Sequence, residues 1–445
     1  MILIKRTTLL FVILFLTGCA TNPAEYVAGI FGADTKRAQI NPITDNPEQD
    51  TNTEELSKSK SFIDGLIFWD TETVDIKNSN LQIKNIWSID IGSGRDAASA
   101  VLHPSFKNNN EVFTIDTNGL ITSVDTEAGE VNWRYNTKLD VTSGILFHDN
   151  KLFFGTSDGK LYGFETDELK NENSLISSID FTNMLSGGSV LPIIELQLNS
   201  EIASPAIGYQ NIIYFKQGDG DTSAVNILEN RIEWSHQGKN VALSLKGSAA
   251  VTRDSSNIYV ARDDGNFVSL TNDSGKLNWL VSISPKSGRN ELESLRDIEM
   301  TPSIKDGLIY IGSYQGSLIS VDMITGETVW RRQLSIHSNV AIDNDNIYIT
   351  SSDGDLYGLD RFSGDIIWRS IVDKNSLFTS PVSIDQYIIS FSVNGYIAIL
   401  DKNDGKVIHY NKMLDDIDKE SSVYVIDKTL YIVTKNGRLN AVKLN

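Results

Sequence analysis

The amino-acid sequence predicts an all-β fold, an eight-bladed β-propeller of four-stranded antiparallel blades that is closed by pairing of the N- and C-terminal strands. Three observations support this fold. After residue 110 an aromatic or apolar residue stands six positions before a glycine eight times over, a tryptophan follows most of these glycines at a fixed distance, and the two ends of the repeat complete each other. Sheets repeated at a regular spacing are typical of a propeller.

The first part of each unit is a hairpin that turns at the repeated glycine. Asp-Gly and Asn-Gly dipeptides such as Asp158-Gly159, Asp264-Gly265, Asp353-Gly354 and Asn394-Gly395 readily adopt the positive φ angles of tight antiparallel turns. An apolar residue two positions after most of the glycines restarts a strand. The eight pairs are Phe113/Gly119, Phe153/Gly159, Tyr214/Gly220, Tyr259/Gly265, Tyr310/Gly316, Tyr348/Gly354, Ile389/Gly395 and Tyr431/Gly437.

A further strand carries a tryptophan fourteen residues beyond the turn glycine, with His409 in its place in one unit. A large aromatic side chain that recurs at one position in every blade is expected to pack between neighbouring sheets as core. Segments such as Met300-Thr-Pro302, which are followed by apolar residues, supply the fourth strand. The tryptophans are Trp133, Trp234, Trp279, Trp330 and Trp368. A second turn glycine, ten residues after the first, lies at Gly129, Gly275, Gly326 and Gly364, and at Gly405 in the unit with His409.

The ends of the repeat predict how the ring closes. Gly437 is followed by only eight residues, too few for a tryptophan strand of its own, whereas Trp87 stands upstream with no glycine turn before it. An outer strand around Trp87 would therefore pair with the last three strands of the chain and remove the free sheet edges. The propeller is expected to span residues 80–445.

The N-terminus, residues 1–18, has the features of a lipoprotein signal peptide. Two basic residues precede an apolar run that is too short to span a bilayer comfortably. Leu16-Thr-Gly-Cys19 follows and resembles the lipobox, which implies cleavage before Cys19 and acylation of that residue as the lipid anchor. The alternative is an ordinary secretory signal cleaved near Ala20. Because Ala20 is not an aspartate, the periplasmic face of the outer membrane is the favoured location.

Residues 19–79 are expected to form the lipid anchor and a largely disordered tether, because they are rich in polar side chains and lack periodicity. The apolar stretch from Phe62 to Trp69 interrupts this segment. It is either a packing segment on the globular body or a partner-binding motif, and the sequence leaves both interpretations open.

Composition excludes several classes of function. With 445 residues and a formal net charge of −19, the surface would repel nucleic acid and anionic lipid head groups. Cys19 is the only cysteine, so the folded body can hold no disulfide, cysteine-based zinc cluster or Cys/His catalytic pair. The five histidines lack paired metal-ligand spacing, and the acidic runs at Asp219 and Asp343 are expected to be turns instead of calcium loops. We expect no cofactor, no metal, no catalytic residues and no nucleic-acid partner.

The segment from Tyr348 to Trp368 resembles the repeat of quinoprotein-type propellers, and such repeats cover almost all of the chain after residue 80. Together with the lipobox and the eight units, this pattern makes the chain similar to the BamB family, lipoproteins of the machinery that folds β-barrels into the outer membrane. The resemblance implies a non-enzymatic scaffold that assists folding and insertion of outer-membrane β-barrel proteins. It implies BamA and other subunits of the assembly complex as partners, with nascent outer-membrane proteins as a further candidate.

Two insertions break the repeat spacing, and insertions of this kind often carry function. Successive turn glycines are 61 residues apart from Gly159 to Gly220 and 51 apart from Gly265 to Gly316, against 38 to 45 elsewhere. Most of the extra residues fall in 181–202 and 284–300, each just before the first strand of the next blade. We therefore expect both insertions on the same face of the disc.

The resemblance also implies which residues bind the partner. The corresponding loops of the BamB family carry a Leu-x-Leu-Arg segment and an Asp-x-Asp pair that contact BamA, and these match Leu196, Leu198 and Asn199, and Asp297 and Glu299. Asn199 departs from the family's arginine and Glu299 replaces an aspartate, so a charge-assisted hydrogen bond at Asn199 is lost or supplied by another residue. The leucines are expected to be exposed anchors beside paired acids. The alternative is that all five are ordinary solvated loop residues.

Two other classes of function stay open at this point. A periplasmic quinoprotein-type dehydrogenase would share the repeat and hold a pyrroloquinoline quinone and calcium in its central channel, but those enzymes carry a vicinal cysteine pair that this chain lacks. A lipid-anchored propeller that binds other peptides or glycans would have the same sequence pattern, because fold alone does not determine function. Identification of co-purifying proteins would separate these alternatives.

Overall fold

The computed structural model describes residues 82–93, 103–176, 190–202, 204–238, 249–283, 298–419 and 421–444. All of them belong to the second of the two units, 1–66 and 67–445, into which the chain divides. The signal peptide, Cys19, the tether and the stretch from Phe62 to Trp69 lie outside the described residues, as does Asp297. Predictions about these segments stay predictions.

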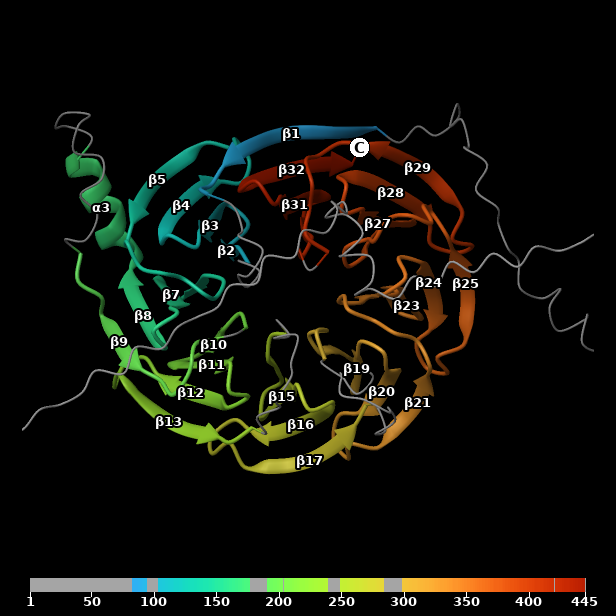
Figure 1. The fold of residues 1–445 in the computed structure, drawn as a ribbon, viewed down its shortest axis with the longest axis horizontal. Helices are drawn as coiled ribbons and strands as arrows, with labels where there is room; N and C mark the ends of the chain where they lie inside the picture. The colour runs from blue at the N-terminus through green and yellow to red at the C-terminus, as the bar shows by residue number, and fades with distance from the viewer. Residues whose placement is uncertain are drawn as a thin grey trace, which may run out of the picture. The chain divides into compact units, whose positions relative to one another are not determined.

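The described residues form eight four-stranded antiparallel sheets, arranged as blades around a central axis (Figure 1). The predicted eight-bladed propeller is therefore confirmed. In blades 1 to 7 the chain runs from the innermost strand outward. The strands of blade 1 are β2 (Ser105–Lys107), β3 (Glu111–Ile115), β4 (Leu120–Asp125) and β5 (Val131–Asn136), and those of blade 2 are β6 (Leu146–His148), β7 (Lys151–Gly155), β8 (Lys160–Glu165) and β9 (Ile194–Gln197).

The next four blades repeat this order. Blade 3 consists of β10 (Ile207–Tyr209), β11 (Ile212–Lys216), β12 (Thr222–Asn226) and β13 (Arg231–His236), and blade 4 of β14 (Thr252–Arg253), β15 (Asn257–Ala261), β16 (Asn266–Thr271) and β17 (Leu277–Ser282). Blade 5 consists of β18 (Ser303–Lys305), β19 (Leu308–Gly312), β20 (Leu318–Asp322) and β21 (Thr328–Arg332), and blade 6 of β22 (Ala341–Ile342), β23 (Asn346–Thr350), β24 (Leu356–Asp360) and β25 (Ile366–Ser370).

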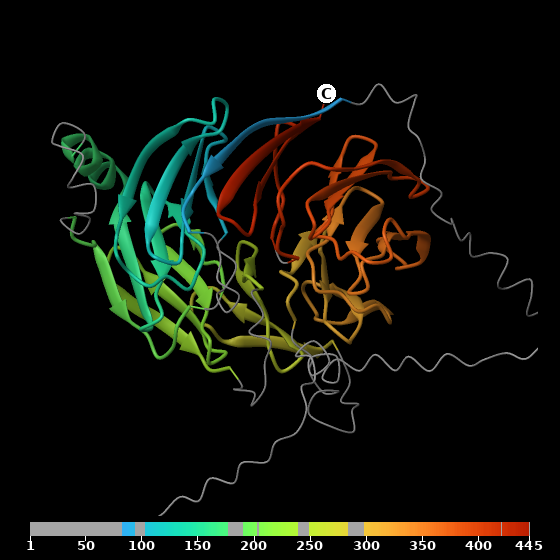
Figure 2. The ribbon, with the colours of Figure 1, turned by 45° about the horizontal axis from the view of Figure 1, so that its top comes forward.

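The last two blades bring the ring to its closure. Blade 7 consists of β26 (Val382–Ile384), β27 (Tyr387–Phe391), β28 (Tyr396–Asp401) and β29 (Val407–Lys412), and blade 8 of β30 (Tyr424–Ile426), β31 (Thr429–Val433), β32 (Arg438–Leu444) and the N-terminal β1 (Ile83–Asp90). β1 pairs with β32 from Ile83 opposite Leu444 to Asp90 opposite Arg438. Figure 2 shows the two strands side by side. The predicted closure by the chain ends is confirmed.

Burial explains why these segments form strands. The second and third strands of a blade lie between two neighbouring sheets, so they are apolar on both faces and almost entirely buried, as in β7 and β19. The fourth strands bury alternate residues, so Trp133 of β5 and Trp368 of β25 face inward between exposed neighbours. The repeated turn glycines have positive φ except at one hairpin, where Gln315 (φ 52°) adopts it in place of Gly316.

Five tryptophans join neighbouring blades in the same way. Each indole lies against the second turn glycine of the following blade, where an added Cβ would come within 2.3 to 2.6 Å of the ring. Each indole Nε1 also donates a hydrogen bond of 2.7 to 3.3 Å to a backbone carbonyl of that turn. The predicted role of these residues as inter-blade core is therefore confirmed. The pairs are Trp87 with Gly129, Trp234 with Gly275, Trp279 with Gly326, Trp330 with Gly364 and Trp368 with Gly405.

Helix α3 (Thr166–Ile176) replaces this turn in blade 2. It follows β8 directly, and Asp167 and Glu168 in its first turn suit the positive end of the helix dipole. Leu169 is fully buried in the cluster that contains Trp133 of blade 1. The first insertion therefore lies between the third and fourth strands of one blade, and it packs on the fourth strand of the blade before.

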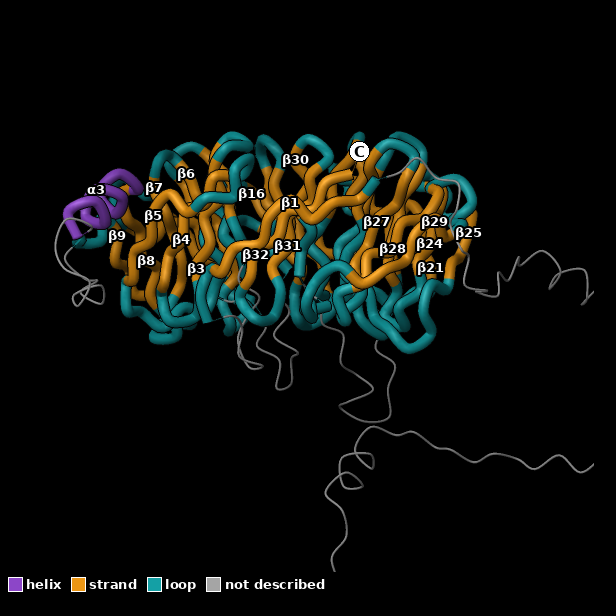
Figure 3. Tube along the Cα trace, turned by 90° about the horizontal axis from the view of Figure 1, so that it is seen from above, coloured by secondary structure: helices purple, strands orange, loops and turns teal. Residues whose placement is uncertain are grey.

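This placement corrects the expectation that both insertions leave the same face. Antiparallel strands reverse direction at each step, so the connection from a third to a fourth strand lies opposite the connection that leads to the next blade. We name the face of α3 the helix face and the opposite one the crossover face. β17 ends and β18 begins at the crossover face, and residues 284–297 between them lie outside the described residues, whereas Figure 3 shows α3 near the upper edge of the ring.

Candidate partner-binding site and channel mouth

The outer strand of blade 2, β9, presents a row of exposed residues. β9 pairs with β8 in the register of Lys160 opposite Gln197 and Tyr162 opposite Glu195. Successive side chains point to opposite sides of a strand, and odd-numbered residues point outward here. The exposed residues of this segment, which we name the β9 row, are Leu191, Ile193, Glu195, Gln197 and Asn199.

Leu196 and Leu198 belong to the opposite side of β9. Leu198 is only 6% exposed and lies in a cluster with Phe153 and Ile213, and Leu196 packs against the same cluster half-buried. The prediction of an exposed anchor is wrong for Leu198, and Leu196 is only partly exposed. The segment is a strand with a side-chain period of two, and a shift of one residue exchanges the buried and exposed sets. Leu191, 78% exposed, and Ile193 are the exposed apolar residues that the sequence reasoning missed.

The polar members of the β9 row are held in place by blade 2 itself. Glu195 accepts a hydrogen bond of 2.7 Å from Lys160 Nζ, and this bond is the main reason that the pKa of Glu195 is lowered. Gln197 Nε2 donates to the carbonyls of Asp158 and Gly159 at 3.0 and 3.1 Å. Asn199, one of the predicted partner-binding residues, is exposed where the chain turns toward blade 3 on the crossover face.

Glu299 lies away from the β9 row and is buried. Its side chain is 5% exposed, and Oε2 is 3.8 Å from Lys419 Nζ. The expectation of a solvent-facing acid at this position is wrong, because the residues before β18 turn inward to the propeller axis. The predicted composite surface of exposed leucines and acids is therefore not formed by Leu198 and Glu299.

Glu299 lines a cavity of about 310 Å³ at the axis, which we name the channel mouth. Residues just before or at the start of the innermost strand surround it from every blade except the second. Sequence reasoning missed this site, although the Ser/Thr-Pro pairs before three innermost strands mark its rim. The lining residues are His103, Pro205, Ala250, Glu299, Thr301, His337, Ser338, Asn339, Ser380, Ser422, Val423 and Tyr424.

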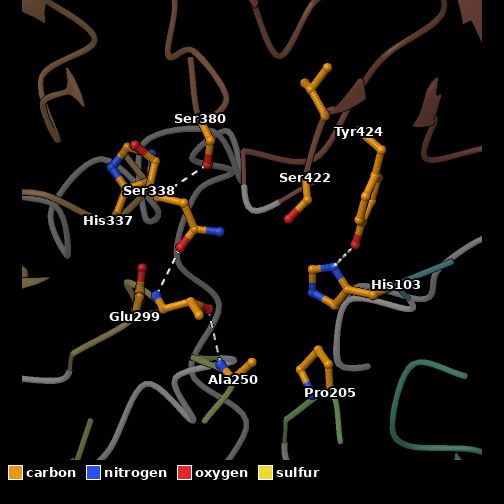
Figure 4. A pocket seen from close by; sticks show the side chains of 12 residues that line it. His103, Pro205, Ala250, Glu299, His337, Ser338, Ser380, Ser422 and Tyr424 are labelled. Carbon is orange, nitrogen blue, oxygen red and sulfur yellow. Dashed lines mark hydrogen bonds between the residues drawn. The ribbon is translucent and has the colours of Figure 1, made fainter. Parts of the chain in front are cut away.

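Hydrogen bonds between neighbouring blades connect the residues that line the channel mouth (Figure 4). Ala250 N donates to Thr301 Oγ1 at 3.1 Å, and Thr301 N donates to Asn339 Oδ1 at 2.8 Å. Asn339 N in turn donates to Ser380 Oγ at 2.9 Å. These bonds link blades 4 to 7 in a chain of side chain to backbone contacts, which holds the lining groups in place.

Two histidines face the channel mouth in different environments. His103 Nδ1 is 3.1 Å from Tyr424 Oη, and burial raises the pKa of that tyrosine. His337 is 3% exposed, and burial followed by the nearby Lys419 charge lowers its pKa to about 4. Among the described residues, the Nε2 atom of His337 has no hydrogen-bond partner. His337 is therefore a neutral ring in the cavity wall.

The channel mouth does not fit the quinone and calcium site that a dehydrogenase would need. Within the described ranges, no group of three or more His, Cys, Asp and Glu side chains comes together to hold a metal ion. The acidic runs form turns: Asp219 Oδ1 accepts from Asp221 N at 3.0 Å, and Asp343 Oδ1 accepts from Asn346 N at 2.7 Å. A vicinal cysteine pair is absent from the sequence.

No helix in the described part of the chain has the length and apolar character needed to cross a bilayer.

Comparisons with known proteins agree with this architecture. The family model described as outer membrane protein assembly factor BamB matches residues 75–172 and 192–370. The outer membrane protein assembly factor BamB of Yersinia pestis is 22% identical over 80% of this chain and 88% of its own length. The crystal structure of BamB from Moraxella catarrhalis superposes with a TM-score of 0.69 at 21% identity, covering 81% of this chain and 100% of that one.

A solved enzyme structure is also similar in fold. Quinohemoprotein alcohol dehydrogenase from Comamonas testosteroni superposes with a TM-score of 0.58 at 10% identity, over 81% of this chain and 76% of that chain. At this identity the likeness concerns the propeller architecture alone, because one fold supports many functions.

Proposed function

This chain belongs to the outer membrane protein assembly factor BamB family, and from that premise we propose that it is a non-enzymatic, lipid-anchored scaffold of the β-barrel assembly machinery with BamA as its direct partner. The family match over more than half of the chain is the observation that carries the proposal. Cys19 would hold the protein at the periplasmic face of the outer membrane. The propeller would assist folding and insertion of outer-membrane β-barrel proteins by positioning other subunits.

The β9 row is the surface that we assign to the partner. Blade 2 is the one described blade whose outer turn is replaced by a helix, and exposed apolar residues directly before its fourth strand lie in line with the hydrogen-bonded polar residues of that strand. Apolar anchors surrounded by polar groups are the usual composition of a protein interface. Leu196 and Leu198 would support this row from inside the blade, and Asn199 would contact the partner at its end. A role for Asp297 stays a prediction.

Affinity purification of the lipidated protein from detergent-solubilised outer membranes tests the proposal. The wild type should bring BamA with it. Leu191→Ser with Ile193→Ser should reduce the BamA recovered by roughly tenfold while leaving Tm near wild type, since exposed apolar anchors at an interface contribute on the order of 1 to 2 kcal/mol. Leu196→Ala with Leu198→Ala should instead lower Tm, because these side chains pack the blade.

The matched control lies on another outer strand. Ile366 and Ile367 of β25 are 46% and 50% exposed, and their double replacement by Ser should leave BamA recovery unchanged. Equal loss in the β25 and β9 variants would show that general surface apolarity, and not the β9 row, holds the partner. Absence of BamA from the wild-type eluate would contradict the proposed function itself.

A further inference from the structure

One arginine of the propeller differs from the other arginines that the structure describes. Eight of the nine donate a hydrogen bond to a carboxylate, a carbonyl or a hydroxyl group. The ninth, Arg253 at the end of β14, has neither a hydrogen bond nor an ion pair within the described part of the chain. Its Nε is buried without a partner, whereas Nη1 and Nη2 reach the solvent. Two N–H donors of a cation are therefore free to bind a ligand.

The ring of Tyr209 holds this guanidinium in position. Cζ of Arg253 is 3.4 Å from the centroid of the ring, which is a close cation–π contact between blades 3 and 4. Each of the two residues is the last of an innermost strand, and innermost strands end at the helix face. The ring covers one side of the guanidinium plane and fixes its orientation, while the edge with Nη1 and Nη2 stays open.

Arg361 shows how a stacked guanidinium is satisfied elsewhere in the same propeller. Its Cζ is 4.1 Å from the centroid of the Phe362 ring, and the group also donates hydrogen bonds to Asp306 Oδ2 and to the carbonyl of Asn344. Arg253 has the same kind of ring contact without the acceptors. The difference between the two arginines is an absent anion.

The acid next to Arg253 in the sequence does not take this place. Asp254 Oδ1 accepts from Ser256 N at 2.7 Å, and Asp254 Oδ2 accepts from Tyr259 Oη at 2.7 Å. These bonds use both oxygens within blade 4, in the turn after β14 and in β15. An anion that pairs with Arg253 would therefore come from outside the described residues.

An exposed leucine lies on the same face of blade 3. Tyr209 stands opposite Ile212, and Ile212 stands opposite Asn226. Leu228 follows two residues later in the outer turn and is 66% exposed. Two strand spacings separate Tyr209 from Asn226, which is about 10 Å. An extended peptide covers this distance with about three residues.

We propose that Arg253 and Tyr209 form a binding site for one carboxylate, the side chain of a glutamate or aspartate in an extended segment of a partner protein, and that Leu228 contacts an apolar residue of the same segment. Nη1 and Nη2 present two N–H donors that match the two oxygens of a carboxylate. Arginine and tyrosine are also the residue types that contribute most to protein interfaces. The net charge of −19 disfavours phosphate, because repulsion grows with the charge of the ligand.

The probe is the peptide acetyl-Leu-Gly-Glu amide, compared with acetyl-Leu-Gly-Gln amide, which has nearly the same shape but no charge. Binding is followed in the full-length lipidated protein in neutral detergent micelles, by the NMR signal of the Tyr209 ring, which Tyr209→Phe identifies. The glutamate peptide should shift this signal saturably, with a dissociation constant on the order of millimolar and at least about fivefold below that of the glutamine peptide. Inorganic phosphate is the third probe and should bind more weakly than the glutamate peptide.

Two variants and a control test the role of the guanidinium. Arg253→Gln should abolish the preference for the glutamate peptide, and Arg253→Lys should reduce it, because the charge stays but the planar fork is lost. Arg332→Gln is the matched control, since Arg332 is 36% exposed and already pairs with Asp365, and it should leave binding unchanged.

Three outcomes would overturn the proposal: equal binding of the two peptides to the wild type, a preserved preference in Arg253→Gln, or tighter binding of phosphate than of the glutamate peptide. The wild-type comparison of the two peptides decides if Arg253→Gln fails to fold. The site shares no residue with the β9 row, so its test stands whether or not that row binds BamA.

Discussion

Two of the kinds of blade junction in the described part of this propeller can be compared directly. At five junctions an indole lies on a turn glycine of the next blade and donates a hydrogen bond to that turn. At the junction of blades 1 and 2 the turn is replaced by α3, and Trp133 packs instead against Leu169 of the helix. The Nε1 atom of Trp133 is buried with no hydrogen-bond partner in the described part of the chain. The junction of blades 1 and 2 therefore lacks the indole hydrogen bond that the five tryptophan junctions contain.

The comparison teaches where this fold tolerates change. The tryptophan junctions need an indole, a glycine and a free carbonyl together, so any single change disturbs all three. The helix junction needs only an apolar contact, which many residues supply. The tryptophan junctions therefore add a hydrogen bond to the apolar contact, whereas the helix junction consists of the apolar contact alone.

The largest effect is expected from removal of a whole junction. A chain that begins at residue 92 lacks β1, so β32 loses its partner strand and Gly129 loses the Trp87 indole. We expect aggregation or loss of cooperative unfolding, because a free β-edge and an open ring result. Light scattering and thermal unfolding measure this, with a chain that begins at residue 80 as the control. A monomer as stable as that control would show that closure contributes little.

A smaller effect is expected at one turn glycine. Gly405→Ala would place a Cβ 2.4 Å from the Trp368 ring at a φ of +70°, which should cost roughly 2 to 4 kcal/mol of the free energy of unfolding. Gly307 has a similar φ of +78° with nothing within 4 Å of an added Cβ, so Gly307→Ala should cost only about 1 to 2 kcal/mol. Urea unfolding measures both values. Equal costs would mean that the indole contact is not the reason for the glycine.

The fold could be predicted from the sequence because its rules are local and repeated. The glycine turns, the tryptophan positions and the mismatched ends specified eight blades and their closure. The site could not be predicted to the same depth. The residues around Leu196 and Leu198 have an alternating pattern, but their outward side depends on the register with β8, which a sequence does not contain.

The channel mouth was missed for a related reason. His103, Glu299 and His337 are far apart in the sequence and stand at unremarkable positions before short strands. Only the closed ring brings these positions to one axis. Blade count was therefore predictable, whereas the direction in which Glu299 faces depended on how the crossover connections turn toward the centre.

The smallest effect is expected when the same substitution, Trp→Phe, is compared between a tryptophan junction and the helix junction. Trp368→Phe and Trp133→Phe remove a similar volume from sites that are 7% and 2% exposed. The free energy of unfolding lost through the cavity should therefore be nearly the same in both variants. Trp368→Phe also leaves the Lys402 carbonyl without its 2.9 Å hydrogen bond, whereas Trp133→Phe removes an N–H that had no partner within the described residues. We therefore expect Trp368→Phe to cost about 1 to 3 kcal/mol more than Trp133→Phe in urea unfolding. Equal losses would mean that packing alone joins the blades, and the hydrogen bond at the tryptophan junctions would then not distinguish them from the helix junction.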